Sequence, residues 1–312
     1  MKQVVLSLHK KDKIKEPIVA CIGYFDGFHI GHMGLIDKVK EHAMIDQAKT
    51  AMISFHPDPW VVLKKQQHVT HLTTLADRVK LAEAAGIDYW IVIQFSKELS
   101  ELTPQQFVDE MLCQLPLTTL VIGFDYRFGH KGEGDAQFLL DNYSCFKTVV
   151  VEQISDSSNK ISTTRISVAI ENGDVDEAMR LLGRPYKVSG IVVHGKKKGR
   201  EIGFPTANVD FSLEYIIPKT GVYVGKVQIK GKEYEAMINV GHNPTFNVKN
   251  DLSIEAYILD FNEEIYDQQI SVLFYKRIRD EVKFDSVQQL IDQMNEDYFY
   301  TRDFFKYYNN EN

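Results

Sequence analysis

Short apolar runs alternate with amphipathic stretches between Ile18 and Ile154. The apolar runs predict buried strands at Pro17–Ile22, Ala51–Phe55, Tyr89–Gln94, Leu120–Ile122 and Thr148–Glu152. Apolar residues at helical spacing predict helices between them, at residues 31–48, 75–85 and 104–115. Strands that alternate with helices in this way are typical of a parallel sheet with helices on both faces.

The pattern changes after Arg184-Pro185. Strand-like runs now follow one another with turn residues, and few helices, between them. These runs predict strands at residues 187–194, 221–229, 233–240, 253–261 and 269–279. Consecutive strands of this kind are typical of an antiparallel barrel or sandwich.

An amphipathic helix is predicted at the end of the chain, over residues 286–305. Its apolar face carries Leu290, Ile291, Met294, Tyr298 and Phe305. A shorter helix is predicted at residues 175–182, where Gly183 ends it just before Pro185. We therefore expect two domains, residues 1–184 and residues 185–312.

Composition narrows the class of protein. The 312 residues are 44% hydrophobic and 25% charged, the balance of a globular protein large enough for two cores. The net charge of −7 argues against a nucleic-acid partner, and no apolar run has the length of a membrane span. Because Met1 is followed by a strand-like run and not by a basic, apolar leader, we expect a cytoplasmic protein. Homo-oligomerisation leaves no signature in the sequence.

The three cysteines, Cys21, Cys113 and Cys145, lie far apart in the sequence, and none belongs to a CxxC pair. An odd number at this spacing argues against a disulfide framework and against a zinc site. We therefore expect buried thiols in a reducing compartment.

A glycine-rich segment with two histidines, residues 23–32 (GYFDGFHIGH), follows the first predicted strand. Glycine lets the backbone approach a ligand closely, and a helix N-terminus attracts anions. His29 and His32, three residues apart, lie on one face of the helix and direct hydrogen-bond donors at the same spot. This combination predicts a site for a nucleoside triphosphate. Two alternatives are a glycine-rich turn whose histidines merely cap the helix and a metal site with Asp26 as a third ligand.

Residues 24–32 (YFDGFHIGH) resemble the FDGxHxGH signature of the prokaryotic FAD synthetases, which are HxGH nucleotidylyltransferases. The resemblance implies that His29 and His32 are catalytic, because they hold the ATP phosphates and stabilise the transition state at the α-phosphorus. The FMN phosphate is then the nucleophile, and pyrophosphate leaves. The further nucleotide contacts implied in this segment are Gly23, Phe25, Asp26, Gly27 and Gly31.

Two later segments extend this resemblance. Residues 123–129 (GFDYRFG) resemble the family's GxDFxFG segment and imply flavin contacts from Asp125, Tyr126, Arg127 and Phe128. Residues 161–166 (ISTTRI) resemble the family's ISSTRIR segment and imply phosphate contacts from Ser162, Thr163, Thr164 and Arg165. Hydroxyls, N-terminal amides and a guanidinium suit a phosphate, although an ordinary helix cap uses the same residue types.

Two positions depart from the family pattern. The family commonly has FDPHP after its second strand, whereas Phe55-His56-Pro57-Asp58-Pro59 exchanges the Asp and the His. A second arginine often follows TRI, and Ser167 stands there instead. We expect that either departure can lower adenylyltransferase activity or change the substrate contacts.

A second glycine-rich segment, residues 194–208 (HGKKKGREIGFPTAN), lies in the second half. It lacks the spacing of a Walker A loop, but its glycines and basic residues suit a phosphate-binding flap. The run GFPTAN resembles the PTAN motif of the riboflavin kinase family, a small closed β-barrel. The resemblance implies that Thr206 and Asn208 bind Mg²⁺ and the ATP phosphates. The further nucleotide contacts implied are Gly195, Lys198, Gly203 and Pro205.

A kinase also needs a base for the ribityl hydroxyl. Residues 239–246 (NVGHNPTF) and 253–261 (SIEAYILDF) resemble the family's NxGxxPTF and ExHLLDF segments. The resemblance implies that Glu255 is the catalytic glutamate, while Tyr257 stands where the family commonly has His. Residues 277–284 (RIRDEVKF) resemble the LRxExxF segment and imply flavin contacts from Arg279 and Glu281.

The resembling segments cover nearly the whole chain and fall in both predicted domains. Together they imply that ATP, with Mg²⁺, phosphorylates riboflavin to FMN and that a second ATP converts FMN to FAD. Two alternatives stay open. In one, a single activity survives, and the departures make the adenylyltransferase the activity at risk. In the other, the chain is a flavin-binding regulator that does not turn over, although a regulator has no chemical need for a base such as Glu255.

Overall fold

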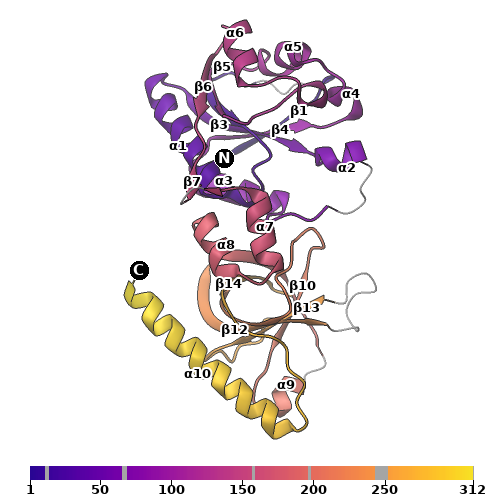
Figure 1. Ribbon diagram of the computed structural model, residues 1–312, viewed down its shortest axis with the longest axis vertical. Coiled ribbons are helices and arrows are strands. Elements are labelled where there is room, and N and C mark those ends of the chain that lie inside the picture. Colours follow the sequence, from indigo (N-terminus) through magenta and orange to yellow (C-terminus); the bar gives the residue numbers. More distant parts are fainter. Residues whose placement is uncertain (11–13, 65–68, 157–158, 196–197, 243–251, 312) are drawn as a thin grey trace. The chain divides into compact units, whose positions relative to one another are not determined.

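The computed structural model describes residues 1–10, 14–64, 69–156, 159–195, 198–242 and 252–311 (Figure 1). The chain forms two compact units, Met1–Thr163 and Thr164–Asn312. Helix α7 (Thr163–Glu171) begins at this division, and α8 (Val175–Leu182) contacts strands of the second unit. The boundary expected at residues 184 and 185 rests on the sequence pattern and stays a prediction.

Six parallel strands form the sheet of the first unit, in the order β1-β4-β3-β2-β5-β6. They are β1 (Lys2–Leu6), β2 (Ile18–Ile22), β3 (Lys49–His56), β4 (Tyr89–Gln94), β5 (Leu117–Gly123) and β6 (Lys147–Val151). The parallel sheet expected from the sequence is thereby confirmed. The strand order reverses between β2 and β5, and open α/β sheets bind ligands beyond the carboxyl ends of strands at such a point.

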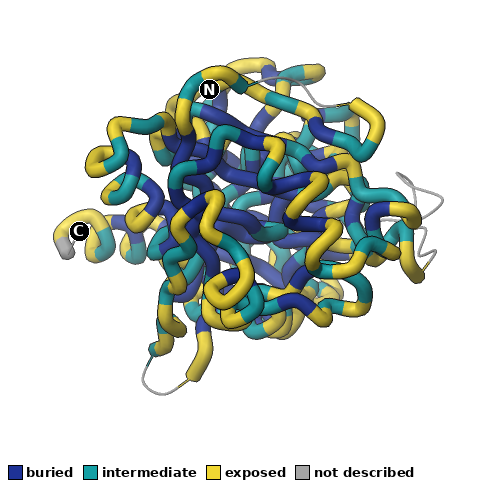
Figure 2. Tube along the Cα trace, turned by 90° about the horizontal axis from the view of Figure 1, so that it is seen from above, coloured by how far each residue is buried: buried dark blue, intermediate teal, exposed yellow. Residues whose placement is uncertain are grey.

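Hydrophobic clusters cover both faces of this sheet. In Figure 2 the buried stretches of the trace lie mainly inside and the exposed ones mainly at outer loops. Strand β2 is buried throughout: Val19 and Cys21 belong to one cluster, and Ile18, Ala20 and Ile22 to the other. This explains its uninterrupted apolar run. Helices α1 (Ile30–Ile45) and α3 (Leu75–Ala84) pack on the first cluster; α5 (Pro104–Phe107), the following turn η2 (Val108–Leu112) and α6 (Ala136–Asn142) pack on the second.

Shorter elements complete the first unit. They are η1 (Asp26–Phe28), α2 (Pro59–Lys64), α4 (Lys97–Ser100), η3 (His130–Gly132), β7 (Ser155–Asp156) and β8 (Asn159–Lys160). The helix expected over residues 104–115 is divided between α5 and η2, where the backbone widens to a π-helical turn. Its N-terminus has Thr103 as the capping residue and Pro104 as the first helical residue.

Six antiparallel strands close into a barrel in the second unit, in the order β10-β13-β12-β11-β14-β9. They are β9 (Tyr186–Val193), β10 (Ala207–Phe211), β11 (Gly221–Ile229), β12 (Lys232–His242), β13 (Leu252–Ile258) and β14 (Gln269–Arg279). The antiparallel barrel is confirmed, but β10 was not expected. It follows the glycine-rich basic segment, which also contains the short helix α9 (Lys198–Glu201).

The last helix, α10 (Val287–Glu311), continues past the end expected at Phe305. Its apolar face is confirmed: Ile291, Met294 and Tyr298 pack on one barrel cluster, and Phe305 is fully buried in another. None of the described helices is both long and apolar enough to cross a lipid bilayer.

The cysteines differ from one another in exposure. Cys21 is buried in the sheet, Cys113 is half-buried at the end of η2, and Cys145 is exposed. The expectation of buried thiols is therefore wrong for Cys145, because this residue lies in the loop between α6 and β6 and not in a core element.

Candidate functional sites

The first unit carries a strained turn directly after β2. Phe25, Gly27 and Phe28 have φ angles of 56°, 78° and 46°, in the left-handed region that non-glycine residues rarely adopt. Each non-glycine residue in this region costs on the order of 1–3 kcal/mol. The rings of Phe25 and Phe28 are buried in the core against α1. Their burial holds the turn in this conformation and fixes where α1 begins.

The two histidines lie at the N-terminus of α1, immediately after the turn. His29 caps the helix, because its Nδ1 accepts a hydrogen bond of 3.3 Å from the His32 amide. An acceptor Nδ1 places the ring proton on Nε2, which becomes a donor. The two rings stack with centroids 3.6 Å apart. A Cβ on Gly31 would lie only 3.0 Å from the His29 ring, so glycine makes room for it.

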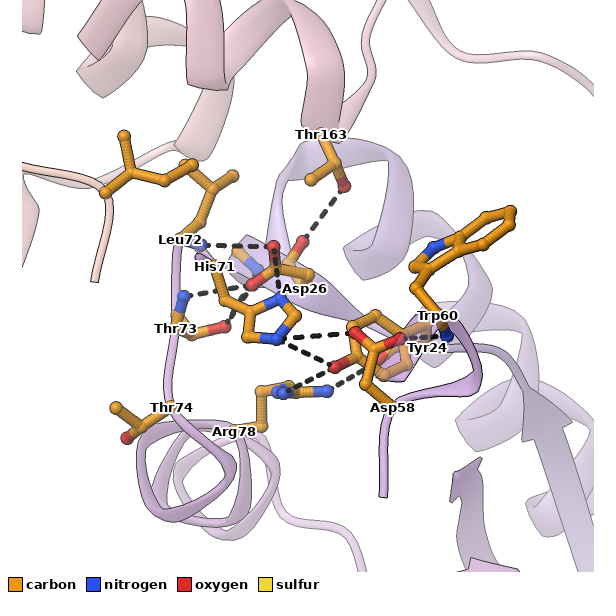
Figure 3. A network of polar contacts seen from close by, with 12 residues as sticks. Tyr24, Asp26, Asp58, Trp60, His71, Leu72, Thr73, Thr74, Arg78 and Thr163 are labelled. Carbon is orange, nitrogen blue, oxygen red and sulfur yellow. Dashed lines mark hydrogen bonds and ion pairs between the residues drawn. The ribbon is translucent and has the colours of Figure 1, made fainter. Parts of the chain in front are cut away.

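Asp26 anchors the turn to a distant segment (Figure 3). Its buried carboxylate accepts hydrogen bonds from the Leu72 amide (3.0 Å), the Thr73 amide (2.9 Å) and the Thr73 hydroxyl (2.8 Å). The Gly27 amide donates to the same hydroxyl at 2.9 Å. The carboxylate thus bonds to protein groups, and the nucleotide contact expected for Asp26 stays a prediction. Among the described residues, no cluster of three or more Asp, Glu, His or Cys side chains is placed to hold a metal ion.

A second layer of the network surrounds His71. Its Nε2 lies 3.3 Å from Asp58 Oδ2 and 3.2 Å from the Tyr24 hydroxyl, and its Nδ1 lies 3.9 Å from Asp26 Oδ2. Arg78 donates to the Tyr24 carbonyl at 3.1 Å and to its hydroxyl at 3.3 Å. Burial raises the pKa of Tyr24, so its hydroxyl keeps the proton that it donates. The network therefore holds the backbone on both sides of Phe25.

The departure in the FHPDP segment bears on this network. Asp58, which stands where the family commonly has His, is buried, contacts His71 and accepts a hydrogen bond from the Trp60 amide at 2.6 Å. His56, the other exchanged residue, is exposed at the end of β3. The exchange thus places a carboxylate beside His71 and a histidine on the surface.

The expected flavin segment follows β5, next to β2 in the sheet. Asp125 forms an ion pair with Lys160, and Arg127 pairs with Asp135 at 3.1 Å. Phe128 is buried in the core, and the Tyr126 ring stacks on it with centroids 5.5 Å apart. The Tyr126 hydroxyl is buried without a hydrogen-bond partner among the described residues, and burial raises its pKa. The Tyr126 hydroxyl therefore keeps its proton.

The ISTTRI segment is divided between the two units. Ser162 is half-buried, and the Thr163 hydroxyl donates to the Asp26 carbonyl at 3.3 Å. Thr164 is exposed in the second unit, where the Arg165 guanidinium lies 2.5 Å from the Glu177 carboxylate of α8. Arg165 thus pairs with a protein carboxylate, and the phosphate contact expected for it stays a prediction. Gly23, the remaining residue of the first site, donates its amide to the Ile53 carbonyl at 3.0 Å.

The barrel brings a row of polar side chains together. Glu255 on β13 is paired in register with Asn208 on β10 and with Asn239 on β12. Residues directly opposite one another in a ladder point to the same face of the sheet. The Thr206 hydroxyl, just before β10, donates to Glu255 Oε2 at 3.0 Å. The strands thus fix Thr206, Asn208 and Glu255, three of the predicted kinase residues, as neighbours.

This row opens into a cavity of about 240 Å³. The polar residues on its wall are Thr206, Asn239, Glu255, Arg279 and Asp297. The rest of the wall is mainly apolar, and includes Ile202, Phe204, Val222, Met237, Tyr257 and Met294. A mainly apolar cavity with a few convergent polar groups suits a flat organic ligand.

Arg279 and Asp297 form the strongest ion pair of this cavity. The guanidinium of Arg279 donates to both carboxylate oxygens of Asp297, at distances from 2.7 to 3.1 Å, and Asp297 is 3% exposed. Glu281 lies against Gly241, where a Cβ would come within 2.3 Å of its carboxylate. Arg279 therefore lines the predicted flavin pocket, whereas the Glu281 carboxylate is beside the Gly241 backbone.

A second cavity, of about 380 Å³, shares Thr206 with the first. Its wall includes Arg200, Pro205 and Tyr266, and Arg200 donates to the Tyr266 hydroxyl at 3.2 Å. The two cavities thus share Thr206, whose hydroxyl donates a hydrogen bond to Glu255 on the wall of the first cavity. A phosphoryl donor in one cavity and an acceptor in the other would face each other at this point.

Glycines shape the loop beside these cavities. A Cβ on Gly195 would lie 2.3 Å from the Asn208 carboxamide, so the loop passes directly over this side chain. Gly203 has a φ of 87°. Lys198 begins α9, while its side chain, like residues 243–246 of the NPTF segment, lies outside the described residues.

Sequence reasoning did not single out Asp297, Asn239 or His71. For Asp297 there was a signal: Leu290, Met294 and Asp297 follow one another at helical spacing and all line the cavity. Asn239 lies in the NVGHNPTF segment, but a single strand does not show which residue it faces. His71 is 45 residues from Asp26, and no local pattern connects them.

Known proteins resemble both units. The family model described as FAD synthetase matches residues 11–165, and the model described as riboflavin kinase matches residues 182–305. A bifunctional riboflavin kinase/FMN adenylyltransferase of Listeria monocytogenes is 42% identical over 289 residues, which cover 92% of each chain. The Bacillus subtilis protein of the same name is 38% identical over 93% of this chain and 92% of its own.

A crystal structure from Streptococcus pneumoniae, described as a macrolide-efflux protein, has the same fold. It matches with a TM-score of 0.87 and 34% identity over 96% of this chain and 99% of its own. Its description differs from the names of the curated relatives, which agree with both family models. The chain therefore belongs to the family of bifunctional riboflavin kinase/FMN adenylyltransferases.

Proposed function

We propose that this chain phosphorylates riboflavin to FMN in the barrel and adenylylates FMN to FAD at the histidine turn of the first unit. The observation that carries the kinase is that two cavities share Thr206, whose hydroxyl donates to Glu255 on the wall of the first cavity. The strained turn with two histidines, at the switch point of the sheet, supports the second activity. The family membership supports the combination of both.

In the kinase reaction, Glu255 accepts the proton of the ribityl hydroxyl as that oxygen attacks the γ-phosphorus of ATP. The hydrogen bond from Thr206 orients the carboxylate. Arg279, held by Asp297, fixes one side of the cavity in which the flavin lies. ADP leaves through the cavity that contains Arg200 and Tyr266.

The oxygen atoms beside Glu255 fit a magnesium ion. The Thr206 hydroxyl and the Asn208 carboxamide are hard ligands, and the register of β10 and β13 places Asn208 opposite the Glu255 carboxylate. When bound, Mg²⁺ would neutralise charge on the ATP phosphates. Gly195 lies against the same carboxamide, so its backbone is close to where the phosphates would bind.

In the adenylyltransferase reaction, a phosphate oxygen of FMN attacks the α-phosphorus of ATP, and the bond to pyrophosphate breaks. The His29 Nε2 donor and the N-terminal amides of α1 stabilise the negative charge that develops. His32, stacked on His29, supplies the second imidazole. Tyr126, three residues after the neighbouring strand β5, would contact the flavin.

Two reciprocal variants test this proposal in one chain. With Mg·ATP, chromatography separates riboflavin, FMN and FAD. We expect His29→Ala to lower FAD formation from FMN by about 100-fold or more and to leave riboflavin phosphorylation unchanged. We expect Glu255→Gln to lower phosphorylation by a factor on the order of 100 to 10,000 and to leave FAD formation from added FMN unchanged.

The wild-type chain separates the alternatives in the same assay. If riboflavin stops at FMN and added FMN is untouched, only the kinase is active, and Asp58 and Ser167 become the residues to revert. If neither flavin changes while both still bind, the chain is a regulator. If one variant abolishes both activities while it stays folded, the assignment of two separate sites is wrong.

A further inference from the structure

Two of the cysteines, which the sequence places 32 residues apart, meet on the surface of the first unit. Cys113 Sγ and Cys145 Sγ lie 2.7 Å apart. Both are free thiols; Cys113 is half-buried and Cys145 is exposed. Sulfur atoms this close need little backbone movement to form a disulfide. Cys21, in contrast, is fully buried in the sheet.

The segments that carry the two thiols are held together by other contacts. Cys113 follows η2, and Cys145 lies in the short loop between α6 and β6. In this loop, the Tyr143 hydroxyl donates to the Gln105 carbonyl of α5 at 3.1 Å. Phe146, the residue after Cys145, is buried in the core cluster that also contains Leu112. The closeness of the thiols therefore follows from how the two segments pack.

We propose that Cys113 and Cys145 form a reversible dithiol–disulfide site, oxidised by a small-molecule disulfide. The exposed Cys145 thiolate attacks one sulfur of that disulfide and releases its first thiolate. Cys113 then gives its proton to the released small thiolate and attacks the Cys145 sulfur, which forms the protein disulfide and releases the second small thiolate, protonated by water. The two electrons of the protein thiols thus reduce one small disulfide to two small thiols.

The order of attack follows from the surroundings of each sulfur. Burial and the hydrogen bond with Cys145 raise the pKa of Cys113 to about 12, so this thiol stays protonated at neutral pH. Only thiolates attack disulfides. Cys145 is therefore the first nucleophile, and the attack on Cys145 by its adjacent partner is intramolecular.

The alternative is a structural zinc site. Such a site needs four ligands, and two cysteines supply only two of them. No cluster of three or more metal-ligating side chains occurs among the residues that the structure describes. The bridge would join the end of η2 to the loop before β6 and close a long loop of chain. Closing such a loop restricts the unfolded chain more than the folded one and stabilises the unit that contains it.

The test counts thiols in the purified full-length chain. The chain is equilibrated with oxidised and reduced glutathione, quenched with acid and unfolded before the free thiols are titrated. We expect the count to fall from three to one, with a Cys113–Cys145 peptide in the non-reducing digest. Dithiothreitol should restore all three. Cys113→Ser and Cys145→Ser should each abolish the cross-linked peptide.

The melting temperature of the first unit gives a second readout. Oxidation should raise it by about 5 to 10 °C in the wild type and leave it unchanged in Cys113→Ser. Three thiols that persist at a strongly oxidising glutathione ratio would overturn the proposal. So would a stable glutathione adduct on Cys145, a cross-link between two chains, or a lower melting temperature after oxidation. Neither readout uses catalysis, so the result is independent of the function proposed above.

Discussion

The two sites of this chain hold their reacting groups by different means. In the barrel, Asn208, Glu255 and Asn239 are neighbours because three strands pair in register, and the backbone ladder fixes them whatever their side chains are. In the first unit, His29 follows a turn whose backbone is strained, and its position depends on two backbone amides and one hydroxyl of a segment more than 40 residues away. A β-ladder holds its residues in place through many repeated backbone hydrogen bonds, whereas the turn is held by only a few hydrogen bonds. A single substitution outside the reacting groups should therefore harm the first site more.

The largest effect of this kind is expected for Asp26→Ala. Its carboxylate accepts hydrogen bonds from the Leu72 and Thr73 amides, and the substitution would leave both amides buried without a partner. Each such group costs about 1–3 kcal/mol. A displacement of His29 by about 1 Å should lower FAD formation by about 100-fold, since catalysis depends steeply on geometry. Steady-state kinetics should show a fall in kcat larger than any change in KM for ATP.

Kinase activity of the same variant is the internal control, because the barrel does not use this turn. Asp26→Asn keeps one acceptor oxygen and should recover part of the rate. Asp37→Ala removes an exposed carboxylate from α1 in the same unit and should change neither activity. If Asp26→Ala forms FAD at the wild-type rate, the turn does not need its anchor and the contrast between the two sites fails.

This contrast also explains what the sequence could predict. Strands such as β2 and β4 are continuous apolar runs, and the histidine turn is a compact motif, so both are visible locally. Strand β10 was missed because its exposed Asp210 and half-buried Asn208 alternate with only a few apolar residues, directly after a proline-containing basic segment. Local patterns predict buried segments and turns. Strand β10 is instead stabilised by pairing with the strands on either side, which a local pattern does not show.

The sequence also did not predict contacts between residues that are far apart in the chain. The sequence shows Asp26 as a polar residue next to a histidine motif, which fits a ligand contact as well as an anchor. Only the fold brings Thr73 to it. The same holds for Cys113 and Cys145, which the spacing suggested were unrelated. Pairing between distant segments depends on packing of the whole unit, and no window of sequence contains that information.

A second, smaller effect is expected for Arg279→Ala in the barrel. This variant refines the comparison of the two sites. In the barrel, the interaction that a single substitution can break is the contact of α10 with the strands and not the pairing of the strands. The substitution leaves the Asp297 carboxylate, 3% exposed, without its guanidinium. Breaking a buried ion pair costs about 3–5 kcal/mol. Thermal unfolding should show a lower melting temperature for the second unit, and riboflavin phosphorylation should fall because both residues line the cavity.

Arg302→Ala is the matched control for this pair. Arg302, also on α10, pairs with the exposed Asp260 and lies 3.7 Å from Glu235, and its own side chain is 45% exposed. Exposed pairs contribute about 0–1 kcal/mol, so this variant should melt close to the wild type. Equal losses of stability in Arg279→Ala and Arg302→Ala would show that the burial of Asp297 does not make its ion pair more stabilising than the exposed one. The double variant Arg279→Met, Asp297→Leu removes both charges and should recover stability without recovering kinase activity.

The smallest effect is expected for Tyr257→His, which introduces the residue that the family commonly has. Tyr257 faces Met237 across the β12–β13 ladder, and its ring meets the Phe204 ring at a centroid distance of 5.1 Å. The ladder keeps the backbone in place, so the loss is limited to this contact, about 1 kcal/mol. We expect kcat of the kinase to stay within about twofold and KM for riboflavin to change by less than about tenfold, the equivalent of 1.4 kcal/mol. A loss of kcat approaching that of Glu255→Gln would show that a side chain on the ladder controls the geometry of its neighbour two residues away. The barrel would then depend on individual contacts as much as the histidine turn does.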